Sequence, residues 1–500
     1  MKIDVSGLGA VKVRCDLLSL SVFEGAVKPA GELAAVDKAL KGVISSLISG
    51  HEISGKKNSA VLVHTHGKLP ARYVLVAGAG KRDEFDLESV RMFAAATVRH
   101  AKKIKAKTVA AVFPADSVTG AGPLEAFRSF AEAAFIQNYQ FAGYKTGGDE
   151  DDGSSVLSML ICENTPAYIK VCKKALDIAG VCADAVNKTR ELVNMPSNML
   201  TPKIFTLEAK KVCARNRIKI KAMDAAQIRK MGMGAIWGVA KGSENPPAVL
   251  VIKYNGASAS SKPVALIGKG VTFDSGGISI KPSKKMGDMK EDMAGAAAVL
   301  YSMEAAARLK AKKNIIAVIP LVENMPSGGA LKPGDVIKTM SGKTVEIIST
   351  DAEGRLILAD AITYAKKLGA SKIIDFATLT GACTTCLGDI AAAVLGNDKE
   401  LVKTLINAAE RSGERLWELP LYDDYREYLK SSVADQKNCS DLGKASTSTA
   451  AVFLKEFVGE TPWAHVDIAG IASLERDVRF WGKGATGAGV LAAVNYLLYS

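Results

Sequence analysis

From about residue 218 onward, short runs of apolar and β-branched residues alternate with longer alanine-rich segments. The short runs suit buried strands, and the alanine-rich segments have the length and spacing of helices. The expected strands span 248–252, 264–267, 315–319, 345–348, 373–377 and 465–468, and the expected helices span 295–309, 358–368 and 401–412. Near-continuous apolar strands joined by helices predict an α/β fold with a mostly parallel sheet covered by helices on both faces.

The first third of the chain shows a second, separate alternation. Strands are expected at 60–63, 73–78 and 108–113, and the segment 88–103 between the last two predicts the helix of a βαβ unit. An acidic, glycine-rich loop at 147–153 follows, and Pro166 begins a stretch with helical spacing. Five hundred residues exceed one ordinary core. We therefore expect a smaller N-terminal α/β domain (1–165), a linker helix (166–190) and a second domain (191–500).

Charge is unevenly divided between these two parts. The chain carries a net charge of +13. Up to residue 165 there are 20 basic against 18 acidic residues, and beyond it 45 against 34. A basic domain suits nucleic acid or an acidic surface, but no run of five lysine or arginine residues occurs. Basic residues scattered over helix faces explain the charge better than a DNA-binding motif does.

The sequence favours a cytoplasmic protein. Its N-terminus is charged where an export signal needs an apolar segment, and no apolar stretch is long enough to span a membrane. Eight unevenly spaced cysteines do not form a disulfide framework. Cys383 and Cys386 have the spacing of a redox pair, but we interpret both as small buried apolar residues.

Candidate chemistry begins at Asp351, Glu353 and Arg355. They follow the run 343–350, which we interpret as a buried strand of the open sheet. Such folds bind ligands at the carboxyl ends of their strands. A surface turn with a salt bridge is the competing interpretation of these three residues taken alone.

A second segment favours a functional site over a surface turn. Lys269, Asp274, Lys281 and Asp292 all lie in glycine-rich connections or at the first turn of an element, not on the solvated face of a long helix. Together the two segments contain four acids, two lysines and an arginine that could converge. Carboxylates that bridge two divalent cations are the usual basis of a two-metal hydrolytic site.

Histidine contributes little to this site. Only His465 lies in the second domain, inside an expected strand, so we interpret it as structural. His64 and His66 are expected to share a strand face, as a solvated or structural pair in preference to a metal site. Any metal in this domain must then be held mainly by oxygen atoms, which favours magnesium, manganese or zinc.

The order and spacing of these residues resemble the leucyl aminopeptidase family, the hexameric cytosol aminopeptidases with two zinc or manganese ions. The resemblance runs from about residue 190 to the C-terminus, and it includes the segments 190–202, 463–470 and 484–487. It implies a smaller N-terminal domain, similar to macro domains, that serves assembly. Ser349 is a departure, because the family usually has asparagine there.

The resemblance also implies roles for the metal ligands. Asp274 and Glu353 would bridge two ions, Asp351 would complete the looser site, and Lys269 with Asp292 would complete the tighter one. Lysine binds a metal only as the free amine, so the ions must lower its pKa strongly. A water that bridges the ions would become a hydroxide and attack the peptide carbonyl.

Two cations are the implied catalytic residues. Lys281 would polarise the carbonyl and stabilise the oxyanion, and Arg355 would hold a bicarbonate that acts as general base. One ion would bind the α-amine of a peptide substrate, so that leucine-like N-terminal residues are released. The weak candidates for the pocket lining are Met286, Met289, Thr378 and Ala469.

Two alternatives stay open from the sequence. One is a basic, oligomeric scaffold that contacts nucleic acid. The other is a different two-metal hydrolase that acts on phosphoesters or other amides, which fold alone does not exclude. The lysine ligand and the pairing of Lys281 with Arg355 argue against this second alternative.

Overall fold

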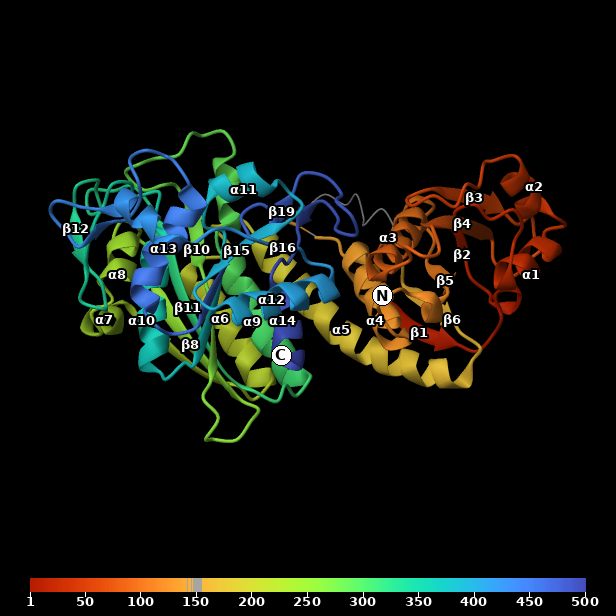
Figure 1. The fold of residues 1–500 in the computed structure, drawn as a ribbon, viewed down its shortest axis with the longest axis horizontal. Helices are drawn as coiled ribbons and strands as arrows, with labels where there is room; N and C mark the ends of the chain where they lie inside the picture. The colour runs from red at the N-terminus through yellow and green to blue at the C-terminus, as the bar shows by residue number, and fades with distance from the viewer. Residues whose placement is uncertain (142, 145, 147–154) are drawn as a thin grey trace. The chain divides into compact units, whose positions relative to one another are not determined.

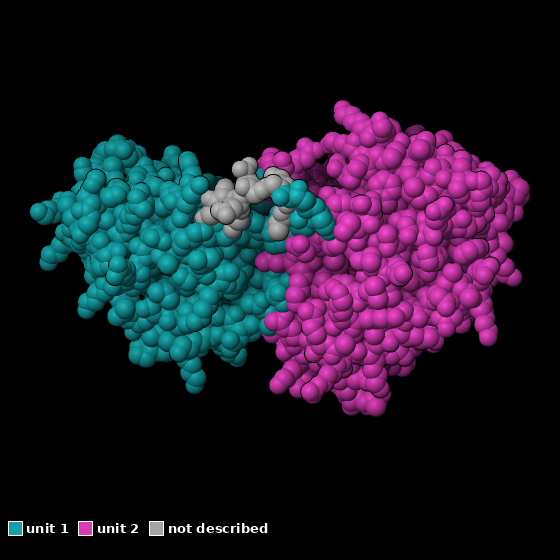
Figure 2. All heavy atoms as spheres, turned by 180° about the vertical axis from the view of Figure 1, so that it is seen from behind, with its two compact units in different colours: residues 1–184, 477–482 teal, residues 185–476, 483–500 magenta. Residues whose placement is uncertain are grey.

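A computed structural model describes residues 1–141, 143–144, 146 and 155–500. The expected acidic loop at 147–153 lies outside the described residues. The chain forms two compact units, Met1–Asp184 with Asp477–Gly482, and Ala185–Arg476 with Lys483–Ser500 (Figure 2). The sequence placed the boundary near residue 165, and the division of the structure falls within helix α5 (Pro166–Asn194). No helix among the described residues is long and apolar enough to cross a membrane.

Unit 1 contains a six-stranded sheet in the order β1-β6-β5-β2-β4-β3. Its strands are parallel except for the edge strand β3. Their bounds are β1 Lys2–Ser6, β2 Leu17–Phe23, β3 Ala60–His64, β4 Tyr73–Gly80, β5 Thr108–Val112 and β6 Ser158–Cys162. The expected strands and the helix between them, α3 (Leu87–Lys103), are confirmed. The expected strand face shared by His64 and His66 is wrong, because β3 ends at His64 and the chain turns at His66 with φ 49°, where the His66 amide donates to the His64 Nδ1 at 2.9 Å.

Unit 2 is built on a nine-stranded sheet in the order β16-β15-β18-β14-β9-β11-β8-β7, with β10 paired to β11. Its centre is parallel, and antiparallel pairs lie toward both edges. The bounds are β7 Lys219–Met223, β8 Ala248–Asn255, β9 Val264–Gly268, β10 Gly270–Asp274, β11 Asn314–Asn324, β14 Lys372–Ala377, β15 Ala392–Gly396, β16 Leu416–Glu418 and β18 Trp463–Asp467. The predicted α/β class with a mostly parallel sheet is confirmed.

Helices cover both faces of this sheet, as expected (Figure 1). One face carries α6 (Pro202–Arg215), α9 (Ala294–Arg308), α12 (Lys399–Ser412) and α14 (Val490–Tyr499). The other carries α8 (Gly234–Ala240), α10 (Gly354–Lys367) and α13 (Ser446–Val458). The apolar sides of the second group form a core with the central strands, in which Leu356, Phe453 and Trp463 are fully buried.

The sequence predicts that the run 343–350 is a strand of the main sheet. This prediction is wrong. Only β13 (Thr344–Glu346) is regular, and it belongs to a small sheet with β12 (Val336–Lys338) and β17 (Gln436–Lys437). The physical reason is that buried and partly exposed residues alternate along this run: Val345 and Ile347 are buried, and their neighbours are partly exposed. A central parallel strand is buried on both faces and would be apolar throughout. The segment 349–353 therefore reaches α10 as irregular chain.

Candidate metal centre

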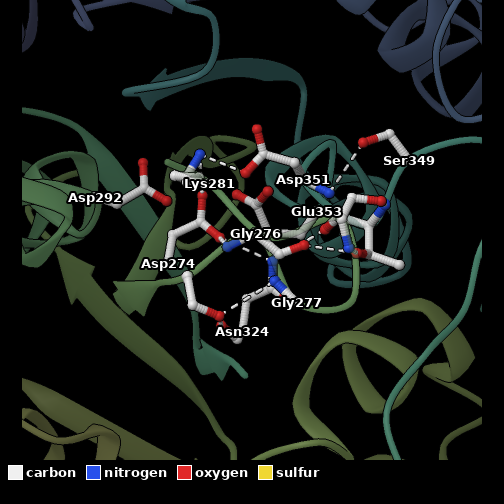
Figure 3. Close-up of polar contacts among 12 residues, drawn as sticks. Asp274, Gly276, Gly277, Lys281, Asp292, Asn324, Ser349, Asp351 and Glu353 are labelled. Carbon is white, nitrogen blue, oxygen red and sulfur yellow. Dashed lines mark hydrogen bonds and ion pairs between the residues drawn. The ribbon is translucent and has the colours of Figure 1, made fainter. Parts of the chain in front are cut away.

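The chemistry-bearing residues of the two sequence segments do meet, beside the carboxyl ends of the central strands (Figure 3). Lys269 lies between β9 and β10, and Asp274 is the last residue of β10. Asp292 ends a short 3-10 helix, η3 (Met286–Glu291), and Glu353 is the N-cap of α10. All four are ends of regular elements, so the packing of those elements determines where the side chains lie.

Three of these residues form what we call the closed half of the site. The Lys269 Nζ lies 2.7 Å from Asp292 Oδ1 and 2.8 Å from Glu353 Oε1, and it donates to the Thr378 carbonyl at 2.9 Å. The three charged side chains are 3%, 8% and 2% exposed. Gly354 makes this approach feasible, because a Cβ there would lie 2.6 Å from Lys269 Cε. The lysine is thereby packed against the first turn of α10.

The open half consists of Lys281, Asp274 and Asp351. The Lys281 Nζ lies 2.8 Å from Asp274 Oδ2 and also forms an ion pair with Asp351 Oδ1. Lys281 is 21% exposed and Asp351 38%, in contrast to the closed half. The chain reaches Lys281 through Gly276 and Gly277, whose φ angles of 85° and 65° favour glycine.

The oxygen atoms of this cluster suit divalent cations. Asp274, Asp351 and Glu353 each offer a carboxylate oxygen, and these oxygens lie within 4.8 Å of one another. In addition, Asp292 Oδ2 and Glu353 Oε2 are buried without a hydrogen-bond partner among the described residues. Buried carboxylate oxygens are costly without a partner. A cation that these residues coordinate would remove that cost.

The pKa values reflect the same crowding. Burial raises the pKa of Asp292, Glu353 and Asp351 above the ordinary carboxyl range. Burial by itself lowers the pKa of Lys269, but the carboxylates of Asp292 and Glu353 outweigh it and the net shift is upward. The pKa of Lys281 is raised in the same way, with Asp274 as the main charged cause. Both lysines are therefore cations at neutral pH when only the protein's own charges act on them.

Arg355 stands beside the cluster, in the first turn of α10. It is 6% exposed, its Nη1 donates to the Asn438 carbonyl at 2.9 Å, and no ion pair joins it to an acid within the described part of the chain. Its Nε has no hydrogen-bond partner among the described residues. Burial lowers its pKa. A buried guanidinium with an unused donor is suited to bind a small anion.

Sequence reasoning missed the amide groups that hold the acids. The Asn324 Nδ2, at the end of β11, donates to Asp274 Oδ1 at 2.8 Å and to the Thr350 carbonyl at 2.9 Å. Thr378 is a candidate for the pocket lining from the sequence, but in the structure its Oγ1 donates to Asp292 Oδ1 at 2.8 Å. The sole available signal for Asn324 was a polar residue at the end of an apolar run.

Three further sequence candidates, His465, Cys383 and Cys386, form no hydrogen bond or ion pair with the clustered acids among the described residues. His465 is fully buried on β18, and its Nδ1 lies 2.5 Å from Asp375 Oδ1 on β14. Cys383 is buried as expected, and burial raises the pKa of its thiol to about 12. The same expectation is wrong for Cys386, which is exposed because it faces outward from the short helix α11 (Gly381–Leu387).

Comparison with known proteins places this chain in a family. Residues 187–494 match the model of the cytosol aminopeptidase family's catalytic domain, and residues 20–148 match that of its N-terminal domain. The chain belongs to the cytosol aminopeptidase family. It is therefore a metal-dependent aminopeptidase, a hydrolase that acts on peptides, and the resemblance drawn from its motifs is confirmed.

Individual relatives agree over nearly the whole chain. A probable cytosol aminopeptidase of Alkaliphilus oremlandii is 40% identical over 490 residues, 98% of either chain. One from Geobacter sulfurreducens is 43% identical over 465 residues, 93% of this chain and 92% of the relative.

Two solved structures share the fold of this aminopeptidase. A mutant of tomato leucine aminopeptidase superposes with a TM-score of 0.88 at 30% identity, covering 100% of this chain and 97% of its own. The bottromycin maturation enzyme BotP, in a complex with Mn, has a TM-score of 0.84 at 31% identity, covering 96% and 98%.

Proposed function

We propose that this aminopeptidase uses two divalent ions per subunit, manganese or zinc, held by Lys269, Asp274, Asp292, Asp351 and Glu353. The observation that carries the proposal is the pair of buried, unpartnered oxygens on Asp292 and Glu353, beside three carboxylates within 4.8 Å of one another. Four carboxylates against two ammonium groups leave an excess of negative charge, and dications neutralise such an excess.

The two halves suggest how the ligands divide. Lys269 and Asp292 would hold an ion in the closed half, and Asp351 would hold one in the open half. Asp274 and Glu353 would help to hold both, because their carboxylates converge and, unlike that of Asp351, are almost inaccessible to solvent. For Lys269 to bind an ion it must lose its proton, so a dication has to counteract the carboxylates that raise its pKa.

The chain's own cations then assist hydrolysis. When bound, the ions would acidify the attacking water and fix the substrate's α-amine. Lys281 stays protonated, since Asp274 and Asp351 surround it, and in the open half it can donate to the scissile carbonyl oxygen. Arg355, whose Nε has no partner among the described residues, would hold a bicarbonate that supplies a general base.

We further propose a preference for leucine and other apolar N-terminal residues and a homohexameric assembly. The preference is supported by the likeness to a leucine aminopeptidase structure. Assembly is supported by large apolar side chains left exposed, such as Trp417 at the sheet edge and Tyr422, both 66% exposed. Light scattering coupled to size-exclusion chromatography measures the mass of the assembly. A monomer at micromolar concentration would contradict the hexamer.

Hydrolysis of leucine p-nitroanilide tests the proposed chemistry. The protein is stripped of metal, refilled with Mn²⁺ or Zn²⁺, and assayed beside Asp351→Asn and Lys281→Ala. Asp335→Asn is the matched control, because it removes an acid from a pair with Lys332 on the surface. Activity that requires metal and collapses only in the first two variants supports the assignment. Full activity in Asp351→Asn would refute the ligand set, and stronger cleavage of glutamate or lysine p-nitroanilide would refute the apolar preference.

A further inference from the structure

The irregular segment 348–353 carries two of the proposed ligands, yet little regular structure holds it. It follows the short strand β13 and reaches α10 only at Gly354. Irregular chain is ordinarily mobile unless other groups bind its backbone. Asp351 and Glu353 need accurate placement, so some part of the protein must bind the backbone of this segment.

One side chain does this from a distant part of the sequence. The Asn438 Oδ1 accepts from the Ile348 amide at 2.8 Å and from the Ser349 amide at 3.4 Å. Its Nδ2 donates to the carbonyls of Ser349 at 2.6 Å and Ala352 at 3.4 Å. Both ends of one amide thus pair with the backbone, as a neighbouring strand would.

The main chain of Asn438 is engaged as well. Its amide donates to the Glu346 carbonyl at 2.9 Å, one residue beyond the pairing of β17 with β13. Its carbonyl accepts from Arg355 Nη1 at 2.9 Å. Asn438 is 0% exposed, so these bonds are shielded from water. A single residue therefore contacts the chain before, within and after the proposed ligand segment.

We propose that Asn438 is a positioning residue that holds Asp351, Glu353 and Arg355 in register for metal binding and hydrolysis. This inference rests on the roles proposed above for those three residues. Asn438 acts through the backbone of the segment 348–352 and through the guanidinium of Arg355, and its amide touches none of the carboxylates. Loss of the amide would leave the acids present but displaced.

The chemistry requires an amide at this position. Aspartate has the same shape and keeps the acceptor for the Ile348 amide, but it replaces the donor with an oxygen facing the Ser349 carbonyl at 2.6 Å. Two acceptors at that distance repel each other. Serine keeps one short donor and acceptor and allows the segment to relax. Activity should therefore fall in the order Asn438, Asn438→Ser, Asn438→Asp.

The chain supplies a matched control in Asn314, the first residue of β11. Its Nδ2 donates to the carbonyls of Ser258 at 2.7 Å and Ser261 at 2.8 Å, and its Oδ1 accepts from the Ala257 amide at 3.2 Å. Asn314 is 9% exposed and lies at the opposite end of the strand from Asn324. Asn314→Asp thus breaks the same kind of backbone contact away from the acids.

The experiment measures three quantities on the full chain for Asn438→Asp, Asn438→Ser and Asn314→Asp. These are kcat and KM on leucine p-nitroanilide, Mn²⁺ affinity by calorimetry, and the thermal midpoint. We expect kcat and Mn²⁺ affinity to fall about 10- to 100-fold in Asn438→Asp, as for residues that orient metal ligands. Asn314→Asp should lower only the thermal midpoint.

If Asn438 only stabilises the fold, its substitution should lower the thermal midpoint and leave kcat and Mn²⁺ affinity unchanged. If Asn438→Asp and Asn438→Ser keep kcat and Mn²⁺ affinity within twofold of the parent once folded protein is counted, the proposal is wrong. It is also wrong if Asn314→Asp loses both to the same extent. If Asn438→Asp does not fold, Asn438→Ser decides by the same criteria. Failure of the metal site itself shows separately, as full activity in Asp351→Asn.

Discussion

The two halves of the site contain the same chemistry in different surroundings. In each, one lysine bridges two carboxylates at ion-pair distance. In the closed half the side chains are nearly inaccessible, whereas Lys281 and Asp351 of the open half are partly exposed. Coulomb interactions weaken with exposure to water. The closed half is therefore suited to retain an ion and the open half to meet substrate.

This contrast supports the proposal that exposure, and not residue type, distinguishes Lys269 as a metal ligand from Lys281 as a catalytic group. Lys269 cannot reach a substrate, because Asp292, Glu353 and the Thr378 carbonyl surround its Nζ. Lys281 is partly exposed to solvent, so its ammonium group can replace an ion pair to one carboxylate with a hydrogen bond to a substrate carbonyl. Five substitutions or conditions test this difference, in order of decreasing effect.

Glu353→Gln should have the largest effect. It removes the charge of a buried residue proposed to hold both ions, so kcat/KM on leucine p-nitroanilide should fall by at least about 10³-fold. This loss is larger than that caused by substituting a residue that only hydrogen-bonds to a metal ligand. Bound Mn²⁺, measured by elemental analysis, should fall with it. Glu304→Gln is the control, because Glu304 is also a buried glutamate in an ion pair, with the partly exposed Lys188 at 3.1 Å. Equal losses in both variants would mean that burial alone explains the result.

Lys281→Ala should separate catalysis from metal binding. Loss of a donor to the developing oxyanion costs about 10²- to 10³-fold in kcat. Mn²⁺ content should stay near that of the parent, since Lys281 is not a proposed ligand. Lys285→Ala, an exposed neighbour paired with Glu475, should leave kcat unchanged. If metal content falls as far as activity, the division between the halves is incorrect.

Thr378→Val should weaken the closed half without removing a ligand. The substitution deletes the hydroxyl bonded to Asp292 but keeps the carbonyl that contacts Lys269. We expect Mn²⁺ affinity to fall about 10- to 100-fold, measured by calorimetry. Thr363→Val, which removes a buried hydroxyl bonded within α10, serves as control. Unchanged affinity in Thr378→Val would show that Asp292 needs no such support.

Metal affinity should rise with pH. The carboxylates raise the pKa of Lys269, so the lysine carries a proton through the neutral range and that proton must leave when an ion binds. One released proton gives about a tenfold gain in affinity per pH unit. Calorimetry between pH 6 and 8, in buffers of different ionisation enthalpy, counts the protons. A flat profile would show that Lys269 stays protonated and is not a ligand.

Ser349→Ala should have the smallest effect. The Ser349 Oγ accepts from the Asp351 amide at 3.2 Å, in the partly exposed half. Such a bond contributes about 0.5–1 kcal/mol, so kcat/KM should fall by less than about fivefold. Ser349→Asn restores the residue usual in the family, and its kcat/KM on leucine p-nitroanilide and on dipeptides should stay within the same range. A tenfold change in either variant would assign Ser349 a direct role.

The strength of the sequence prediction differs between these regions. Lys269, Asp274, Lys281 and Asp292 were expected in glycine-rich connections or at the first turn of an element. Lys269 and Asp274 flank or end β10, Lys281 lies in the connection that follows it, and Asp292 lies between η3 and α9. The strand expected before Asp351 was assigned to the wrong sheet. The alternation at Val345 and Ile347 indicates one buried face, but it does not indicate which strands pair with it. Asn438 gave no pattern at all, and Asn324 gave only the weak signal of a polar residue at the end of an apolar run, since an isolated asparagine is ordinary in any sequence.

The sequence by itself determined the α/β class, the family and the identity and order of the acids and lysines, because periodicity and motif spacing are local properties of the chain. Only the tertiary structure decided which lysine is buried and which is open. It alone showed that Asn438 holds a segment that lies 86 to 90 positions earlier in the chain. These features depend on contacts between distant residues, and burial and hydrogen-bond pairing arise only once those contacts form.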